Sequence, residues 1–258
     1  MKSFLKYTLA TIVGVIIVNI IIFFIFLLFI SAIAAFSEKN VDIKNNSILT
    51  IKFDGEILDR TSDNPLDNIN LFSLTPKKNL GMNKILACIK NAAVDPRITG
   101  IYLDLTEIQG NFGALAFTEE IRNALAKFKE SGKFIYSYSN LGYSQKSYYL
   151  ATIANKIFVN PETPLLLSGM SSNISFYKET LEKLGIQAEV VKVGKFKSAV
   201  EPFISTEMSE ANREQVKKYL DSSWGTITKA ISASRNIPVD SINRLANHFD
   251  IYTTGQFK

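Results

Sequence analysis

The sequence predicts an α/β protein that follows one membrane-spanning helix. Along most of the 258-residue chain, segments with helical spacing of apolar residues alternate with short apolar strand segments. This alternation is typical of parallel strands joined by crossover helices. No charged residue occurs between Lys6 and Glu38, which leaves an apolar run long enough to cross a bilayer. The chain is 47% hydrophobic, enough for one large core or two smaller ones beside that helix.

The amino-terminal apolar run predicts an uncleaved signal anchor. It is longer than the roughly 7 to 15 apolar residues of a cleaved signal peptide, although small residues at 31–35 resemble a cleavage site and keep that alternative open. Lys2 and Lys6 precede the run, and basic residues favour the cytoplasmic side of a membrane. We therefore expect residues 1–38 to form a cytoplasmic start and an inner (cytoplasmic) membrane anchor. Residues 39–258 would then form a single domain in the periplasm or outside the cell.

The soluble part begins with strand and helix signals in turn. Apolar and polar side chains alternate over residues 48–53, which predicts a strand. Residues 59–76 are rich in Asp, Asn, Ser and Pro and predict a long surface loop. From Met82 to about residue 95 the apolar positions fall on one helical face, and a buried strand follows over residues 100–105.

The same alternation continues toward the carboxyl end. The expected elements are a helix over 117–128, a strand over 133–138, a short helix over 147–154, a strand over 156–159, a helix over 176–184, a strand over 188–193, a long helix over 209–235 and a short helix after it. Gly132 and Pro238 are expected to end helices. Ser209 has a suitable side chain to cap the long helix.

Composition argues against several classes of function. The chain has 29 basic and 24 acidic residues, and the basic ones are scattered, so we expect no nucleic-acid partner. The single cysteine, Cys88, and the single histidine, His248, cannot build a disulfide framework or a cluster of Cys and His metal ligands. A phosphate-binding loop around residues 194–195 would need glycine in place of Glu189 and Ser or Thr in place of Phe196. We therefore expect no cofactor and no metal.

The segment VGKFKSAVEPF at residues 193–203 holds the main candidate for catalysis. Burial penalises the charged ammonium and can lower a lysine pKa from about 10.4 by up to about 3 to 5 pH units. Such a lysine can act as the general base for a serine hydroxyl. Lys197, with small and apolar neighbours after it, is a better candidate than Lys195. Ser198 is not expected to be its partner, because adjacent side chains point in different directions.

A serine nucleophile would have to come from elsewhere. Ser144 and Ser147 lie between a predicted strand and a predicted helix, where a reacting group is favourably placed. Serines that cap a helix or stabilise a turn occur at the same place. Both interpretations stay open at this point.

Four ordered blocks of sequence carry a resemblance to a known family. They are DPRITGIYLDL at 95–105, YSQKSYYLATIANKIFVNP at 143–161, VGKFKSAVEPF at 193–203 and EMSEANRE at 207–214. Together they resemble the amino-terminal half of the long form of the signal peptide peptidase A family, also called protease IV. The resemblance implies a crotonase-like or Clp-protease-like fold and a membrane-anchored serine/lysine endopeptidase that degrades remnant signal peptides. It also implies that the lysine of KSAVEPF, Lys197, is the general base.

The resemblance further implies that this chain lacks the serine nucleophile. In the long form the serine lies in a carboxyl-terminal repeat, within a motif of the type SGGYY. Aligning that motif on Tyr148 and Tyr149 puts Gln145 at the position of the serine. The family arrangement implies a homo-oligomer, a tetramer, in which a carboxyl-terminal half supplies the serine and an extended peptide is the substrate. The ending DIYTTGQFK resembles a family segment that normally continues, so we expect the repeat to be truncated there.

Two other functions stay open. The first is a catalytically silent, membrane-anchored scaffold or binding module, which Gln145 favours for the isolated chain. The second is a crotonase-type acyl-thioester enzyme, against which the anchor and the KSAVEPF segment both count. Gly110 and Gly113 are candidates for backbone donors in a substrate loop, but flexible glycines in a connection explain them equally well.

Overall fold

The structure is a computed structural model of the chain, and its helices and strands fall into two compact units. It describes residues 2–35, 42–61, 69–70, 75–76, 79–106, 114–248 and 252–253. The first unit contains helix α1 (Lys2–Ala35) and the antiparallel pair β3 (Ile69–Asn70) and β4 (Thr75–Pro76). The second unit, residues 45–60 and 79–258, contains the other elements. The expected domain boundary after residue 38 lies outside the described residues.

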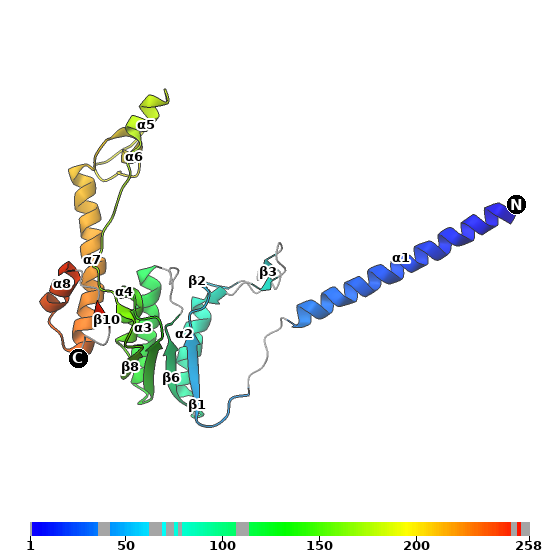
Figure 1. The fold of residues 1–258 in the computed structure, drawn as a ribbon, viewed down its shortest axis with the longest axis horizontal. Coiled ribbons are helices and arrows are strands. Elements are labelled where there is room, and N and C mark those ends of the chain that lie inside the picture. The colour runs from blue at the N-terminus through cyan, green and yellow to red at the C-terminus, as the bar shows by residue number, and fades with distance from the viewer. Residues whose placement is uncertain are drawn as a thin grey trace. The chain divides into compact units, whose positions relative to one another are not determined.

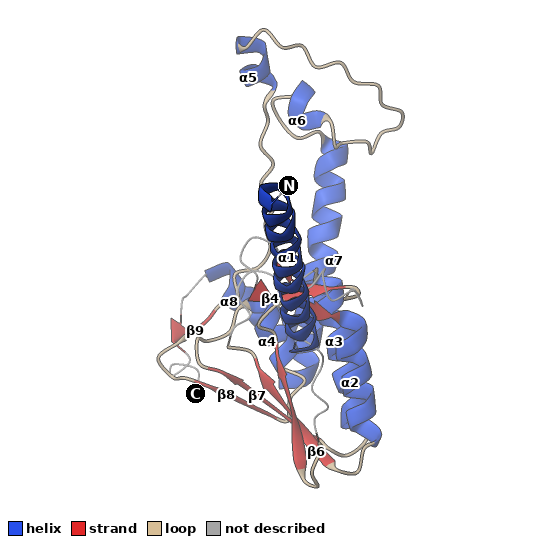
Figure 2. Cartoon of the chain, turned by 90° about the vertical axis from the view of Figure 1, so that its right-hand side faces the viewer, coloured by secondary structure: helices blue, strands red, loops and turns tan. Residues whose placement is uncertain are grey.

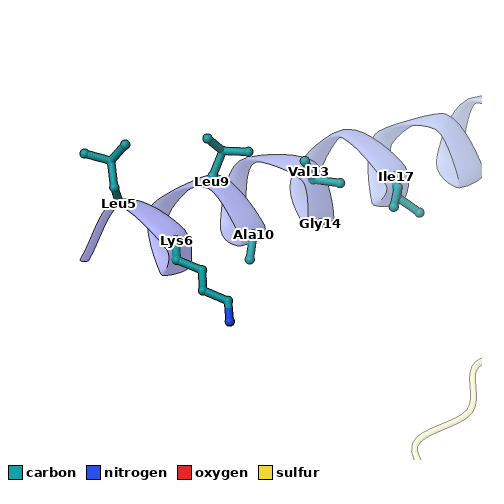
Figure 3. A pocket seen from close by; sticks show the side chains of 7 residues that line it. All are labelled: Leu5, Lys6, Leu9, Ala10, Val13, Gly14 and Ile17. Carbon is teal, nitrogen blue, oxygen red and sulfur yellow. The ribbon is translucent and has the colours of Figure 1, made fainter. Parts of the chain in front are cut away.

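Helix α1 is long and apolar enough to cross a membrane. The stretch Ser3–Phe29 meets this criterion by its length and composition, and its side chains are exposed. Leu5, Leu9 and Val13 follow one another along the helix (Figure 3) because their spacing of four residues is close to one turn. A signal sequence near an amino terminus would satisfy the same criterion, so the anchor and its orientation stay predictions.

Four parallel strands form the central sheet of the second unit, in the order β1-β6-β7-β8. Their bounds are β1 Ser47–Lys52, β6 Ile98–Asp104, β7 Phe134–Ser139 and β8 Lys156–Val159. Helices lead from one strand to the next: α2 (Met82–Val94) precedes β6, α3 (Leu115–Lys129) precedes β7 and α4 (Gln145–Ala151) precedes β8. The predicted class, parallel strands with crossover helices, is therefore confirmed.

One face of the sheet supplies most of the core. In β6 and β7 the buried and half-buried side chains alternate, and Ile101, Leu103 and Ile135 are fully buried. Figures 1 and 2 show α2 and α3 on one side of the sheet, and Ile89 and Leu125 are the fully buried side chains at their centres. Burying each Leu or Ile side chain contributes about 1.5 to 3 kcal/mol, so this layer stabilises the domain.

Local signals end the helices where the sequence predicts. Asp95 follows α2, and Gly132 follows α3 with a φ of 79°, a conformation that residues with a Cβ rarely adopt. Ser209 is the cap of α7 (Glu210–Arg235), since its side chain accepts the Asn212 N–H. Asn236, with a φ of 55°, ends α7 in the left-handed conformation.

The long helix α7 joins the body of the second unit to an outlying arm. Its carboxyl-terminal half packs on α4 and on α8 (Val239–His248) through a cluster of Tyr149, Ile227, Ile231 and Ile242. Beyond its amino-terminal end lie α5 (Lys178–Lys183) and α6 (Glu201–Ile204), as Figure 1 shows. We call residues 166–208 the arm. Because α7 has 26 residues, it spans about 39 Å.

Two short strand pairs complete the second unit. Strands β2 (Glu56–Leu58) and β5 (Asn79–Gly81) pair in parallel between β1 and α2 along the chain. Strands β9 (Pro164–Leu165) and β10 (Tyr252–Thr253) pair in antiparallel fashion.

The strand expected over residues 188–193 is wrong. The whole stretch 186–193 lies in the arm as an extended segment without a partner strand among the described residues, and the side chains of Val191 and Val193 are 100% and 85% exposed. The alternation of apolar residues is present, but a strand also needs a neighbour to bond its N–H and C=O groups. The helix expected over 176–184 is confirmed in a shorter form, α5. Gly110 and Gly113 lie outside the described residues.

Candidate active site

Lys197 lies on a tight loop between the extended segment and α6. Gly194 opens this loop with a φ of 103°, which only glycine adopts readily. A Cβ added to Gly194 would lie 3.9 Å from Lys197 Cγ, so the turn brings the backbone against the lysine stem. The Lys197 side chain is exposed, and its amine has no hydrogen bond or ion pair with the described residues. The small and apolar residues that follow Lys197 therefore leave its side chain in contact with water in this chain.

Lys197 lines an open, mainly apolar hollow of about 570 Å³. Its apolar walls include Val191, Val193 and Phe196, and Gln215 of α7 adds a polar group. Lys192 is the other charged side chain that lines it. The hollow therefore combines apolar contact area with an amine that pairs with no acid among the described residues, and this combination suits an extended apolar peptide.

The KSAVEPF loop is attached to the first turn of α7 through Glu201. This side chain is only 4% exposed although it is an acid. Its Oε1 accepts the Ser209 hydroxyl at 2.6 Å, and its Oε2 accepts the Asn212 side-chain amide at 3.0 Å and the Ser209 N–H at 3.3 Å. The hydrogen bond from Ser209 is the main cause that lowers the pKa of Glu201, with burial opposing it.

The two serines singled out by the sequence stabilise the start of α4. Ser144 is the cap of α4, and its hydroxyl accepts the Ser147 N–H at 3.3 Å. Ser147 is buried and donates its hydroxyl to the Ser144 carbonyl at 3.0 Å. Of the two interpretations left open above, the structure confirms the cap.

Gln145, at the position that the resemblance gives to the serine, begins α4. Its side-chain amide donates to the Gly169 carbonyl at 3.2 Å. The turn before it is held by Tyr143, whose hydroxyl donates to the Phe158 carbonyl at 3.0 Å. Burial raises the pKa of Tyr143 to about 12, so this phenol keeps its proton at neutral pH. The start of α4 is therefore well ordered but presents an amide instead of a nucleophile.

The structure does not bring Lys197 and Gln145 together within one chain. The lysine loop contacts α7 at Ser209, Asn212 and Gln215, whereas α4 packs against the carboxyl-terminal half of α7. These contact points lie roughly 20 to 30 Å apart along the helix, and Figure 1 shows α6 and α4 at different levels of α7. The two positions therefore cannot form one site in this chain.

Sequence reasoning missed a buried arginine that fixes α7 to the body. Arg122 of α3 donates from Nη1 to the Tyr149 carbonyl at 2.6 Å and to the Thr152 hydroxyl at 3.0 Å, and from Nη2 to the Ser234 hydroxyl at 2.7 Å. Its guanidinium also lies 5.0 Å from the centre of the Tyr149 ring. Desolvation lowers the pKa of the Arg122 guanidinium. Its position could have indicated its burial, because Arg122 falls in the apolar stripe of α3.

Comparison with known proteins identifies the family. The sequence profile of Peptidase family S49 matches residues 127–256, half of the chain, and this span includes the KSAVEPF loop and α7. The chain belongs to peptidase family S49. Among curated relatives, Protease 4 of Haemophilus influenzae is 32% identical over 220 residues, and Protease 4 of Salmonella typhi is 39% identical over 153 residues. Serine protease SPPA, chloroplastic, of Arabidopsis thaliana is 29% identical over 205 residues.

These names are those of the family that the four sequence blocks indicate, so the family prediction is confirmed. The matches cover 82%, 59% and 80% of this S49 chain, but they span only 35%, 24% and 28% of the relatives' own lengths. Among solved structures, an enoyl-CoA hydratase/isomerase family protein from Silicibacter pomeroyi matches with a TM-score of 0.25 and 10% identity, covering 65% of this chain and 86% of the other. That likeness is too low to carry an argument.

Proposed function

We propose that this S49 chain is the lysine-bearing part of a membrane-anchored serine/lysine endopeptidase. Lys197 is the general base, and a second S49 segment with an SGGYY-type motif supplies the serine. The observation that carries the proposal is the KSAVEPF loop, which presents Lys197 in an open hollow where no acid of the described part of the chain pairs with its amine. Gln145 at the serine position supports the need for a second segment.

The proposed reaction needs only a lysine and a serine. Lys197 Nζ, in its neutral form, takes the proton of the serine hydroxyl while the serine Oγ attacks the peptide carbonyl. The lysine then gives this proton to the amine of the leaving peptide, and an acyl-enzyme ester remains. A water molecule, deprotonated by the same lysine, hydrolyses the ester and restores the serine. No cofactor takes part.

The surface of the arm supports assembly with a partner. Six large apolar side chains of the arm are between 47% and 100% exposed: Leu184, Ile186, Val191, Val193, Phe196 and Phe203. Three of them, Val191, Val193 and Phe196, line the same hollow as Lys197, and exposed apolar side chains that lie together mark interaction surfaces. We assign this surface to contact with the serine-bearing segment in a homo-oligomer, a tetramer by family resemblance. Such contact would also remove Lys197 from water, which a lysine base requires.

The anchor places the proposed enzyme beside its substrates. Helix α1 would hold the chain in the inner membrane with the second unit in the periplasm or outside the cell. Remnant signal peptides are apolar and extended, and they suit the apolar walls of the Lys197 hollow.

Fluorophosphonate labelling of serine tests this function. The 258-residue chain alone is expected to stay unlabelled, because Ser144 caps α4 and the Ser147 hydroxyl is buried and bonded to the Ser144 carbonyl. Addition of an S49 segment that carries the SGGYY-type motif is expected to give labelling on that segment. Lys197→Ala should abolish it, while Lys195→Ala, the matched control, should keep it. Labelling of the isolated chain, or labelling that survives Lys197→Ala, contradicts the proposal.

A catalytically silent scaffold is the second candidate function. It is favoured by the Gln145 amide, which is bonded to the Gly169 carbonyl and closes the start of α4. Under this function the chain binds the second segment, but labelling of that segment does not depend on Lys197. The acyl-thioester alternative receives no support from the three curated relatives described above, which are named as proteases.

A further inference from the structure

Glu201 is a buried acid whose carboxylate is fully occupied by the first turn of α7. Three hydrogen bonds from Ser209 and Asn212 use both of its oxygens. Asn212 is itself buried, at 5% exposure. Ser209, which donates the other two hydrogen bonds, is exposed, so one of the two donor residues stays in contact with water. Hydrogen bonds to a charged acceptor are about twice as strong as neutral ones, and the Asn212 bond lies in the buried part of this contact.

A backbone hydrogen bond connects Glu201 to the turn that carries Lys197. The Glu201 N–H donates to the Ser198 carbonyl at 3.0 Å, so the residue after Lys197 is tied directly to Glu201. The Ser198 hydroxyl donates to the Gln215 side chain at 3.4 Å. Ser209, Asn212 and Gln215 are spaced three residues apart and share one side of α7. The lysine loop is thus held to this side of the helix at two points.

The negative charge of Glu201 is stabilised by the amino-terminal end of α7. Residue Ser209 caps a 26-residue helix, whose amino-terminal N–H groups and dipole attract a carboxylate. A carboxylate four residues from a lysine base would otherwise be free to pair with the ammonium and hold it in its charged form. Because the Glu201 carboxylate is hydrogen-bonded to α7, it does not pair with the Lys197 ammonium. The same hydrogen bonds attach the lysine loop to the helix.

We propose that Glu201 is a positioning residue, which anchors the Lys197 loop to the amino terminus of α7 and so fixes where the base meets the incoming serine. The anchoring stands on the contacts above, and its catalytic consequence rests on the proposed function. Glu201→Gln keeps the shape of the side chain but removes the charge and one acceptor. Glu207→Gln, an exposed glutamate in the same connection, is the matched control.

Amide hydrogen exchange on the full chain tests the anchor without any enzymatic activity. Glu201→Gln is expected to accelerate exchange of residues 198–205 about tenfold, since the N–H groups of Glu201, Phe203 and Ser205 close the turns that the carboxylate holds. Exchange in β6 and β7 should stay unchanged, which shows that the domain is folded. Unchanged exchange in 198–205, or equal acceleration by Glu207→Gln, overturns the proposal.

Kinetics of the assembled enzyme test the catalytic consequence. Glu201→Gln should lower kcat per labelled serine by about 10- to 100-fold with KM within about twofold of the parent value, because a displaced base slows reaction without altering peptide contacts. Counting labelled serines removes any loss of folded protein from this comparison. An unchanged kcat per labelled serine overturns the positioning role. If the parent enzyme itself is inactive, the proposed function fails, while the exchange result still decides whether Glu201 anchors the loop.

Discussion

Replacement of Arg122 by alanine tests how α7 is fixed to the body of the second unit. The guanidinium is only 7% exposed and links α3 to the Tyr149 carbonyl, the Thr152 hydroxyl and the Ser234 hydroxyl. In the variant these three acceptors lose a cationic donor, and the Tyr149 ring loses the cation beside it. The Thr152 hydroxyl keeps its own bond to the Tyr149 carbonyl at 2.9 Å, so part of the network survives.

The expected loss of stability follows from these contacts. Each buried polar group left without its partner costs about 1 to 3 kcal/mol, and the side-chain stem of Arg122 also loses its packing. Part of this loss is offset because a buried cation no longer has to be desolvated. We expect the free energy of unfolding to fall by about 3 to 4 kcal/mol. With a urea m-value of about 2 kcal/mol per M, the midpoint should fall by about 1.5 to 2 M.

Urea titration of the full chain in detergent, followed by tryptophan fluorescence, measures this change. Trp224 is the single tryptophan, contacts the Tyr149 and Ile227 cluster, and donates to Asn243 Oδ1 at 2.8 Å, so its emission reports on the packing of α7. Arg213→Ala, at an exposed site on the same helix, should change the midpoint by less than about 0.3 M. A midpoint for Arg122→Ala that equals the parent value would show that the Arg122 hydrogen bonds do not stabilise the packing of α7.

Three further predictions concern the turns and the acid anchor. Gly194→Ala should lower the free energy of unfolding by about 1 kcal/mol, because alanine is strained at a φ of 103°. The same substitution should displace Lys197 and so lower the kcat of the assembled enzyme. An unchanged kcat contradicts this prediction. Gly142→Ala should cost more than Gly194→Ala in the same urea titration, because its Cβ would lie 2.1 Å from the Pro164 carbonyl oxygen at a φ of 84°. Because the pKa of Glu201 is lowered on folding, its stabilising contribution is present above the unfolded pKa of about 4.3 and is lost as pH falls below it. The urea midpoint should therefore fall between pH 6 and pH 3, and less so in Glu201→Gln; parallel curves would rule this out.

The fold was predictable wherever a segment contacts its own neighbours along the chain. The strands around Ile101 and Ile135 and the helices around Ile89 and Leu125 show clear periodicity, and each buries the face that this periodicity marks. The Ser209 cap depends on a contact three residues away, and it too was predicted. The segment 186–193 has the pattern of a strand, but its state depends on a neighbour that no local pattern specifies.

The candidate site was predictable only in part. Lys197 followed from its small and apolar neighbours and from the family resemblance, but its exposure in this chain did not follow from either. The hydrogen bonds of Glu201 to Ser209 and Asn212 depend on how the loop folds back onto α7, which no spacing rule gives. The buried contacts of Arg122 could have been predicted from its position in the apolar stripe of α3, because a charged residue at such a position needs buried acceptors.

Peptide hydrolysis by the assembled enzyme measures directly whether Lys197 is the general base. The chain is combined with the serine-bearing S49 segment, and kcat is compared for the parent, Lys197→Ala and Lys195→Ala. Lys197→Ala is expected to lower kcat by roughly 100- to 10,000-fold, as for loss of a general base, whereas Lys195→Ala should stay near the parent value. Hydrolysis that continues at the parent rate in Lys197→Ala would show that Lys197 is not the base.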